Sequence, residues 1–390
     1  MKKKRNALVS SRILMALLAV VMVFTFAAST LGATVSAETG AFWQNDSIYT
    51  DYKSYLDGSV VQALPKTVDE NETISVIVKL DTPTLMDAYN KTDKHITFAE
   101  YVHTEEAQKI KAEIQAEKER YLIALTRSSI PYETGCDYAN ILAGFEVLYT
   151  AKNFENACKY LTEGATAIVG EVYNVSETKL VENKIDVIEE TGIFDSSDFM
   201  INGQKYSGSG MVVAVLDTGL DYTHPAFDPV RLDKSNLSLT KNKVAAHIAN
   251  TVASTRVPGL TADDVYINEK VPFAFDYADN DSDVYSLHNN HGTHVSGVIV
   301  GNDDTVAEVT SDGKEVKLVG VAPDAQLVSM KIFSDIQDTA RASWILAALE
   351  DCVELGVDVI NMSLGTACGF SRETDEEQMS GVYDSIRSLH

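Results

Sequence analysis

The chain has 390 residues, a formal net charge of −25 and a hydrophobic share of 45%. This length accommodates two or three globular domains with sizeable cores, and the hydrophobic share excludes a wholly disordered chain. The strong acidity argues against a nucleic-acid-binding protein, because a phosphate backbone requires a positively charged surface.

The first 37 residues are typical of a secretory signal peptide. A basic run, Lys2–Arg5, precedes the sixteen-residue apolar stretch Ile13–Ala28 and the small residues Val35-Ser36-Ala37. We predict cleavage after Ala37. An uncleaved anchor is the alternative, but the apolar stretch falls short of the roughly 20 residues that span a bilayer. Cleavage changes the net charge from −25 to −30, because the segment carries five basic and no acidic residues. The expected product is secreted or cell-envelope associated, with no transmembrane span.

Residues 38–71 form a polar N-terminal segment, and residues 72–175 have the pattern of a small α+β domain. Strands are expected over residues 74–80, 140–149 and 167–175, and helices over residues 104–126 and 153–161. The order β-α-β-α-β is typical of a ferredoxin-like unit, in which two helices cover one face of an antiparallel sheet.

A charged, turn-rich linker over residues 176–207 leads to an α/β domain over residues 208–390. Strands are expected at 211–216, 326–333 and 357–363, with a helix over 339–355 between the last two. Buried apolar strands that alternate with helices predict a mainly parallel sheet flanked by helices. The chain stops at His390 without a helix cap or a following strand, so we expect this domain to be truncated at its C-terminal end.

The four cysteines are sparse and show no CxxC spacing that would indicate a zinc site. Disulfides are an option in an exported chain, but we expect buried free thiols. The cysteines are Cys136, Cys158, Cys352 and Cys368.

An aspartate ends the apolar run Met211–Leu216 and is followed by Thr218-Gly219. Open α/β sheets place their sites just beyond the carboxyl ends of such strands. A buried carboxylate at Asp217 needs hydrogen bonds or a cationic partner, because an uncompensated charge is costly to bury. The alternative is an Asx-turn that only ends the strand.

A histidine begins the second motif, the segment His-Gly-Thr-His-Val-Ser-Gly over residues 291–297. The segment is expected to start a helix that packs closely through Gly297. An imidazole at this position, held by a carboxylate on one ring nitrogen, can act as a general base with the other. We therefore predict that His291 is functional and that His294 is a packed, hydrogen-bonded neighbour.

Four segments together resemble, in order and in context, the consecutive motifs of the subtilase family of serine peptidases. The segments are Leu216–Asp221 with His224-Pro225, His291–Val295, Gly320–Pro323 and Val359–Gly365. Phe275–Asn280 and Ala325–Leu327 resemble most the lactocepin-type cell-envelope proteinases. Residues 72–175 resemble, less specifically, the inhibitory propeptide of the family.

The resemblance implies an endopeptidase with an Asp-His-Ser triad, in that order along the chain. Asp217 would orient His291, and His291 would take the proton of the serine hydroxyl. Ser363, Leu364 and Gly365 would form the edge along which an extended protein or peptide substrate pairs. In the complete protein, residues 38 to about 180 would be an intramolecular inhibitor that self-cleavage removes.

The sequence departs from the family pattern in several places. It has no Gly-Thr-Ser-Met-Ala-like and no Ala-Gly-Asn-like segment, so we expect the serine and the oxyanion-hole asparagine beyond His390 and no activity from these 390 residues alone. Cys368 lies on the expected substrate edge, which argues against a nucleophilic role. Ala226 stands where many subtilisins have a calcium-binding aspartate. No cofactor and no metal ligand is therefore predicted, and calcium has no assigned position.

Two other functions remain open. The histidines His288, His291 and His294, beside the acidic run 279–283, favour a metal-dependent hydrolase, but there is no HExxH and Val284 replaces the glycine of an EF-hand loop. Residues 72–175 also fit a non-catalytic module that inhibits a peptidase domain and assists its folding.

Overall fold

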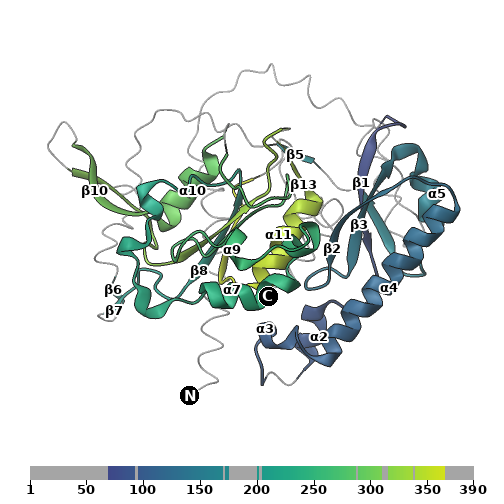
Figure 1. Cartoon of the computed structure of the whole chain (residues 1–390), viewed down its shortest axis with the longest axis horizontal. Coiled ribbons are helices and arrows are strands. Elements are labelled where there is room, and N and C mark those ends of the chain that lie inside the picture. The colour runs from purple at the N-terminus through teal and green to yellow at the C-terminus, as the bar shows by residue number, and fades with distance from the viewer. Residues whose placement is uncertain are drawn as a thin grey trace, which may run out of the picture. The chain divides into compact units, whose positions relative to one another are not determined.

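The computed structural model, shown in Figure 1, describes most of the region from residue 69 to residue 364. The described residues are 69–92, 95–169, 172–174, 200–201, 204–286, 289–309, 315–336 and 339–364. The predicted signal peptide, most of the segment 38–71 and most of the linker 176–207 lie outside them. In this part of the chain, no helix is both long enough and apolar enough to cross a membrane.

The N-terminal part folds as an antiparallel sheet with helices. Its strands are β1 (Thr73–Lys79), β2 (Glu133–Tyr138), β3 (Gly144–Thr150) and β4 (Thr166–Val169), and its helices are α2 (Leu85–Lys91), α3 (Phe98–Tyr101), α4 (Glu105–Arg127) and α5 (Phe154–Cys158). The strand order is β2-β3-β1-β4, and every neighbouring pair is antiparallel. This is the ferredoxin-like arrangement, with one strand more than the sequence pattern predicted.

The additional strand, β2, was missed because its sequence does not alternate cleanly. Gly135 interrupts it, and its register with β3 shifts between Thr134 and Asp137. The predicted strand 167–175 is also shorter, because β4 ends at Val169 and residues 172–174 form β5, which pairs elsewhere.

One face of the antiparallel sheet packs against α4 and α5 (Figure 1). Ile114 and Tyr121 of α4 and Phe154 of α5 share a core with Val76 and Val78 of β1. The helix α4 starts where predicted, because the Thr104 side chain accepts a hydrogen bond from the Ala107 N–H. Apolar residues at helical spacing therefore place this helix on the sheet.

The C-terminal part is built on a parallel sheet. Its central strands are β8 (Val212–Asp217), β9 (Phe273–Asp276), β12 (Gln326–Lys331) and β14 (Val359–Asn361), in the order β14-β8-β12-β9. All three neighbouring pairs are parallel. The helices of this part are α7 (Lys241–His247), α8 (Val252–Arg256), α9 (Ala262–Val265), α10 (His291–Val300) and α11 (Ala342–Glu354).

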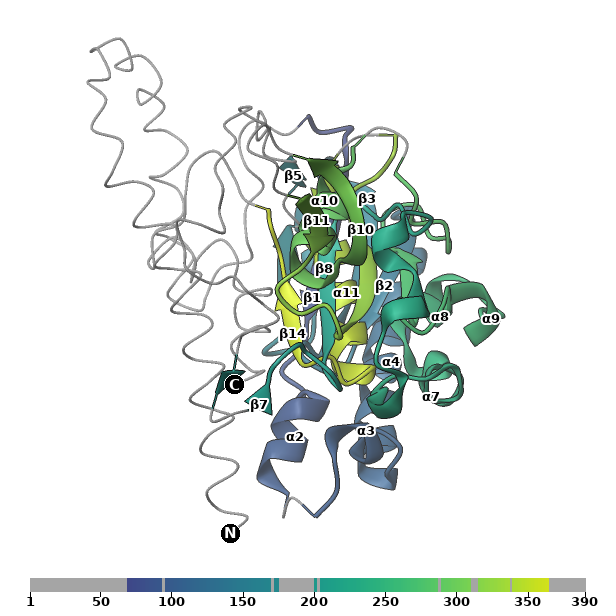
Figure 2. The same ribbon diagram turned by 90° about the vertical axis from the view of Figure 1, so that its left-hand side faces the viewer.

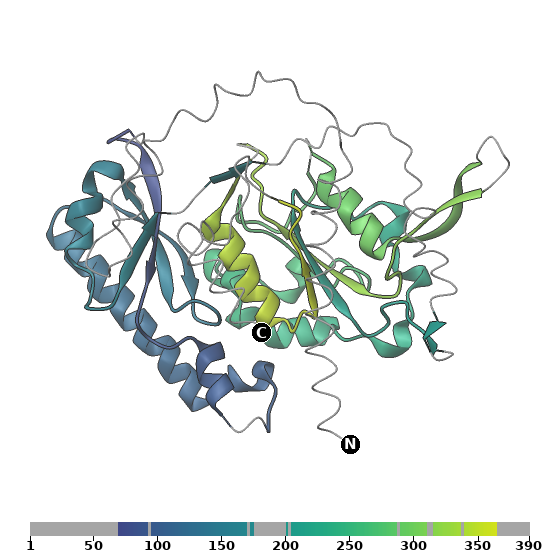
Figure 3. The same cartoon turned by 180° about the vertical axis from the view of Figure 1, so that it is seen from behind.

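Helices cover both faces of the parallel sheet, as Figure 3 shows for α10 and α11. Val212, Ala214 and Leu216 of β8 share a core with α11 residues such as Leu346. Val213 and Val215 point to the opposite face and pack with Val295 and Ile299 of α10. Because successive side chains of a strand point to opposite faces, an unbroken apolar run fits a strand buried on both sides. The predicted mixed α/β class with a mainly parallel sheet is confirmed.

Several elements of this part differ from the prediction. The helix expected from residue 339 begins at Ala342, because residues 339–341 form a short strand, β13 (Thr339–Arg341), paired with β5 (Val172–Asn174). β9 was not predicted. The hairpin of β10 (Asn302–Val309) and β11 (Glu315–Val319), beside α10 in Figure 2, was not predicted either.

The cysteines that the structure describes are buried free thiols, as predicted. They are Cys136, Cys158 and Cys352. Burial raises the pKa of all three thiols, which disfavours the reactive thiolate. Cys368 lies outside the described residues.

Candidate active site

Asp217 and His291 meet at the carboxyl end of the parallel sheet. Asp217 is the last residue of β8, and His291 is the first residue of α10. His291 Nδ1 lies 2.8 Å from Asp217 Oδ1, although 74 positions separate the two residues in the chain. The aspartate side chain is 3% exposed and the imidazole 21% exposed, so the histidine is the member of the pair that solvent reaches.

The contact determines which nitrogen of His291 carries a proton. A carboxylate is only an acceptor, so Nδ1 must be the donor to Asp217 Oδ1. In the neutral ring, Nε2 then has a free lone pair that can accept a proton. The hydrogen bond to Asp217 and the negative charge of Asp217 both raise the pKa of His291, whereas burial lowers it. The net effect is a raised pKa. The pair is thus arranged as a carboxylate-supported general base.

Asp217 Oδ1 also accepts the Thr218 N–H at 2.7 Å. Its second oxygen, Oδ2, is buried and has no hydrogen-bond partner among the described residues. The bond from the Thr218 N–H is a local contact that ends the strand, as the alternative prediction of an Asx-turn at Asp217 requires. The structure shows that this contact and the imidazole contact are present together.

Two threonine hydroxyls join the turn after β8 to the start of α10. Thr218 Oγ1 accepts the Gly292 N–H at 3.0 Å and donates to the Asn289 carbonyl at 3.2 Å. Thr293 Oγ1 accepts the Asp221 N–H at 2.8 Å. These bonds fix the first turn of α10 against the strand end, and so they fix the position of the imidazole relative to the carboxylate.

Two glycines allow this close approach. Gly219 has φ of +118°, which side-chain-bearing residues rarely adopt, and a Cβ there would lie 2.3 Å from the Val284 carbonyl oxygen. A Cβ on Gly292 would lie 2.3 Å from the Gly219 carbonyl oxygen. The expectation that Gly297 provides the close contact is wrong, because a Cβ on Gly297 would meet nothing within 4 Å.

The two other histidines of the motif region do not join this pair. His294 is exposed, which corrects the prediction of a packed neighbour, because it lies on the outward face of α10. His288 lies outside the described residues. In the described part of the chain, two groups of side chains are close enough to share a metal ion, and neither contains His291 or His294. The metal-hydrolase alternative therefore gains no support.

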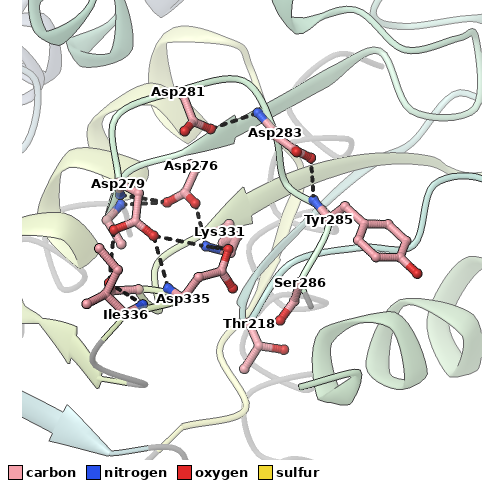
Figure 4. Close-up of polar contacts among 12 residues, drawn as sticks. Thr218, Asp276, Asp279, Asp281, Asp283, Tyr285, Ser286, Lys331, Asp335 and Ile336 are labelled. Carbon is pink, nitrogen blue, oxygen red and sulfur yellow. Dashed lines mark hydrogen bonds and ion pairs between the residues drawn. The ribbon is translucent and has the colours of Figure 1, made fainter. Parts of the chain in front are cut away.

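A second carboxylate, Asp276, ends the strand β9 at the same edge of the sheet. It forms an ion pair with Lys331, the last residue of β12, and both side chains are buried. Lys331 Nζ also lies 3.3 Å from Asp335 Oδ2 and 3.6 Å from Asp279 Oδ2. Figure 4 shows the lysine enclosed by these three carboxylates. The three aspartates form one of the two possible metal groups, but the ammonium already lies among them.

Charge and burial act on this cluster in opposite directions. Burial raises the pKa of Asp276 to about 6, although the charge of Lys331 and its hydrogen bond lower it. Burial lowers the pKa of Lys331, but the three carboxylates outweigh it and the net pKa is raised. Lys331 therefore stays charged, and it lies opposite Asp217 in the register of β12 and β8.

The acidic run after Asp276 forms turns rather than a calcium loop. Asp281 Oδ1 accepts the Asp283 N–H at 2.9 Å, and Asp283 Oδ1 accepts the Tyr285 N–H at 3.0 Å, as drawn in Figure 4. These are local side-chain-to-backbone bonds of the Asx type. They shape the loop that leads from β9 towards His291.

The predicted substrate edge follows β14, which lies at the border of the parallel sheet. Ser363 is exposed and donates to Asn361 Oδ1 at 2.9 Å, and Leu364 packs against the core that contains α11. Gly365 lies outside the described residues. Ser363 and Leu364 thus follow the carboxyl end of β14, at the same end of the sheet as Asp217.

Sequence reasoning missed the strand β13. An isolated bridge joins Ala340 of β13 to Phe333, which follows β12 at the end of the sheet that carries Asp217. The backbone of β13 pairs antiparallel with residues 172–174, from Thr339 opposite Asn174 to Arg341 opposite Val172. The signal was hidden, because residues 339–341 directly precede a long helical pattern.

Three buried acids of α11 were also missed. Glu350 accepts the N–H groups of residues 139, 140, 141 and 142 at 2.5–3.0 Å. Asp351 accepts the N–H groups of Val252 and Ala253 and the Tyr277 hydroxyl. The third, Glu354, accepts from His247 Nδ1 at 3.1 Å. Acids spaced along a helix usually indicate a solvated face, and only the tertiary structure shows that these are buried.

The comparisons with known proteins agree with this geometry. The model of the subtilase family (Peptidase_S8) matches residues 208–388. The PI-type proteinase of Lactococcus lactis subsp. cremoris is 36% identical over 188 residues, which are 47% of this chain and 9% of that protein. The C5a peptidase of Streptococcus pyogenes is 35% identical over 186 residues, 47% of this chain and 14% of that protein.

The crystal structure of fervidolysin from Fervidobacterium pennivorans is similar at a TM-score of 0.42 and 15% identity, over 84% of this chain and 40% of that one. This likeness is too low to support a functional argument. The chain spans only about a tenth of the length of the curated relatives named above. Within that span, the family match covers both Asp217 and His291. Residues 208–388, slightly less than half of the chain, therefore match the subtilase family of serine peptidases.

Proposed function

We propose that the complete protein is a secreted or cell-envelope-associated endopeptidase that cleaves protein or peptide substrates with an Asp217-His291-Ser triad. The hydrogen bond of 2.8 Å between Asp217 and His291 carries this proposal. It joins a buried carboxylate to a solvent-reached imidazole at the carboxyl edge of a parallel sheet, where α/β proteins place their sites.

The chemistry follows from the two ring nitrogens. Asp217 holds the Nδ1 proton of His291, so Nε2 takes the proton of the serine hydroxyl as the oxygen attacks the peptide carbonyl. The carboxylate stabilises the imidazolium that forms, and Nε2 then gives the proton to the leaving amine. An acyl-enzyme results, and water hydrolyses it in a second step. The triad needs no cofactor for these steps, and calcium keeps no assigned position.

The serine is proposed to come from residues C-terminal to His390. The 390 residues contain no Gly-Thr-Ser-Met-Ala-like segment, and the chain order Asp, His, Ser places the nucleophile after His291. We therefore expect no peptidase activity from the 390 residues alone.

Substrate binding is proposed along two strand edges. Ser363 and Leu364, continuing to Gly365, follow the border strand β14, and β13 offers a second edge near the same end of the sheet. An extended peptide can pair with such edges through main-chain hydrogen bonds, while pockets between them select side chains. The pairing of residues 172–174 with β13 is of this kind.

Residues 72–175 are proposed to act as the intramolecular inhibitor of the peptidase domain. Two observations support this. Their last described segment, β5, pairs with β13 as a substrate strand would. The carboxylate of Glu350 accepts four consecutive N–H groups from residues 139–142, which ties the antiparallel unit to α11.

The triad is tested with the complete gene product, including the residues that follow His390. Casein hydrolysis by the wild type should fall roughly 10⁴-fold or more in kcat/KM in Asp217→Ala and in His291→Ala. His294→Ala is the matched control, because this exposed histidine lies one turn further along α10 and should keep wild-type activity. Turnover that survives His291→Ala would contradict the proposal.

Export and processing are tested by N-terminal sequencing of the secreted protein. The inactive variant His291→Ala should begin at Glu38 after removal of the signal peptide. The wild type should begin near residue 180, because self-cleavage removes the inhibitory unit. A wild-type product that retains Glu38 as its N-terminus would count against the inhibitor role.

A further inference from the structure

A cluster of two histidines and a glutamate lies away from the candidate active site. It consists of His103, between α3 and α4, His247, the last residue of α7, and Glu354, the last residue of α11. One ligand atom from each side chain lies within 4.8 Å of the other two. His103 belongs to the antiparallel unit, whereas His247 and Glu354 belong to the peptidase domain.

The carboxylate of Glu354 is only half satisfied. Its Oε1 accepts from His247 Nδ1 at 3.1 Å and from Asn250 Nδ2 at 3.2 Å. Its Oε2 is buried and has no hydrogen-bond partner among the described residues, and the side chain is 0% exposed. A buried carboxylate oxygen without a partner is destabilising, so this atom points to a ligand at the cluster.

The distances suit a tetrahedral ion. Two ligand atoms on one tetrahedral Zn²⁺ are roughly 3.3 Å apart at the usual bond lengths, and His247 Nδ1 and Glu354 Oε1 are 3.1 Å apart. The rings of two zinc-bound histidines have centroids roughly 5 Å apart, against 6.1 Å for His103 and His247. His103 is exposed, so a small rotation of its side chain can close this difference.

We propose that His103, His247 and Glu354 bind one Zn²⁺ ion, which clamps the antiparallel unit to the peptidase domain. Two imidazoles and one carboxylate are a common zinc ligand set and leave a fourth position for water. Calcium and magnesium fit less well, because they prefer oxygen ligands throughout. Zn²⁺ bound to His247 Nδ1 and Glu354 Oε1 displaces the proton of the hydrogen bond between these atoms. The ion compensates the charge of Glu354, and its water ligand is then the donor for the buried Oε2. Zinc binding at this site does not depend on the peptidase activity proposed above.

The test is calorimetric titration of Zn²⁺ into the metal-stripped 390-residue chain. We expect saturable binding of one ion per chain, weakened roughly tenfold or more by His103→Ala, His247→Ala or Glu354→Gln, because loss of even an outer-shell partner costs 10–100-fold. His95→Ala is the matched control, since His95 is an exposed histidine of the same unit outside the cluster. Binding of Co²⁺ should give the visible absorption of a tetrahedral site.

Two outcomes would overturn the site. One is an affinity for Zn²⁺ that is unchanged in His103→Ala, whose fold should persist because the residue is exposed. The other is loss of binding in His291→Ala instead, which would place the ion on the histidines of the segment 288–294.

The clamp has its own readout in the same chain. The N–H groups of residues 139–142 bind Glu350 across the two parts. Zinc should slow their hydrogen exchange in the wild type at least tenfold and leave it unchanged in His103→Ala. Equal slowing in both proteins would contradict a clamp through His103.

Discussion

Two aspartates end the two strands that flank β12, yet their surroundings differ. Asp217 ends β8 and contacts the imidazole of His291, which is 21% exposed. Asp276 ends β9 and contacts Lys331, whose side chain is 0% exposed. One aspartate faces a partner that solvent and substrate can reach, and the other faces an enclosed ammonium. Both aspartates thus occupy the same kind of position at the end of a strand. The comparison shows that the partner of the carboxylate determines its role: a solvent-accessible imidazole suits catalysis, whereas a buried ammonium suits stability.

The largest expected effect on folding comes from removing the enclosed ammonium. Lys331→Met leaves three carboxylates together without their cation, so the free energy of unfolding should fall by about 3–5 kcal/mol. Urea denaturation measures this change. Lys241→Met is the matched control, because the Lys241–Asp263 pair is exposed and such pairs contribute about 0–1 kcal/mol.

A double substitution sharpens this prediction. Lys331→Met with Asp276→Leu removes the most buried charge as well as its partner, so it should recover part of the lost stability. A double variant less stable than Lys331→Met would show that the ion pair is not the reason for the loss.

The close contact between the start of α10 and the turn after β8 can be tested by substituting two glycines of α10. Gly292→Ala places a methyl group 2.3 Å from the Gly219 carbonyl oxygen, so the start of α10 must shift. We expect a loss of about 1–3 kcal/mol in the free energy of unfolding. Gly297→Ala, with no atom within 4 Å, should be neutral or slightly stabilising. Equal effects of the two substitutions in thermal denaturation would refute the contact.

The enclosed cluster should also give a pH dependence. Burial raises the pKa of Asp276 from 3.8 to about 6, so the folded protein holds this proton more tightly than the unfolded chain. The contribution of Asp276 to the free energy of unfolding is therefore greatest below pH 3.8 and is lost as the pH rises to about 6. Asp276→Asn should make this decrease shallower by about 1 kcal/mol per pH unit at most.

Denaturation in urea at several pH values across this window provides the measurement. Asp281→Asn is the control, because the exposed Asp281 side chain accepts one backbone N–H in the same loop and Asp281 contacts Asp276 through its backbone, which the substitution keeps. The slope of Asp281→Asn should match the wild type, and a wild-type slope in Asp276→Asn would argue against a raised pKa at Asp276.

The sequence was sufficient to predict that Asp217 pairs with His291. An apolar run ending in Asp217, and a histidine before a helical segment, are local signals, and the parallel strands bring them to one edge. The partner of Asp276 had no such signal. Lys331 ends a strand as any surface lysine could, and its three carboxylates come from positions 276, 279 and 335.

Other features depended on tertiary contacts for the same reason. The acids of α11 are spaced like a solvated helix face, but they are buried against segments more than 70 positions away. β13 has three residues, too few for a strand pattern, and forms only because residues 172–174 pair with it. The close contact was expected at Gly297 and occurs at Gly292, since the sequence does not show which side of α10 meets the turn after β8.

The most direct test of the account is an NMR titration of the His291 imidazole in the 390-residue chain, with Asp217→Asn as the comparison. The hydrogen bond to Asp217 should place the pKa of His291 above 6.5 in the wild type, and Asp217→Asn should lower it, because burial then acts without the carboxylate. Asp221→Asn removes a charge from the same turn without touching the ring and should leave the His291 pKa unchanged. A His291 pKa at or below 6.5 that does not respond to Asp217→Asn would contradict a carboxylate-supported general base.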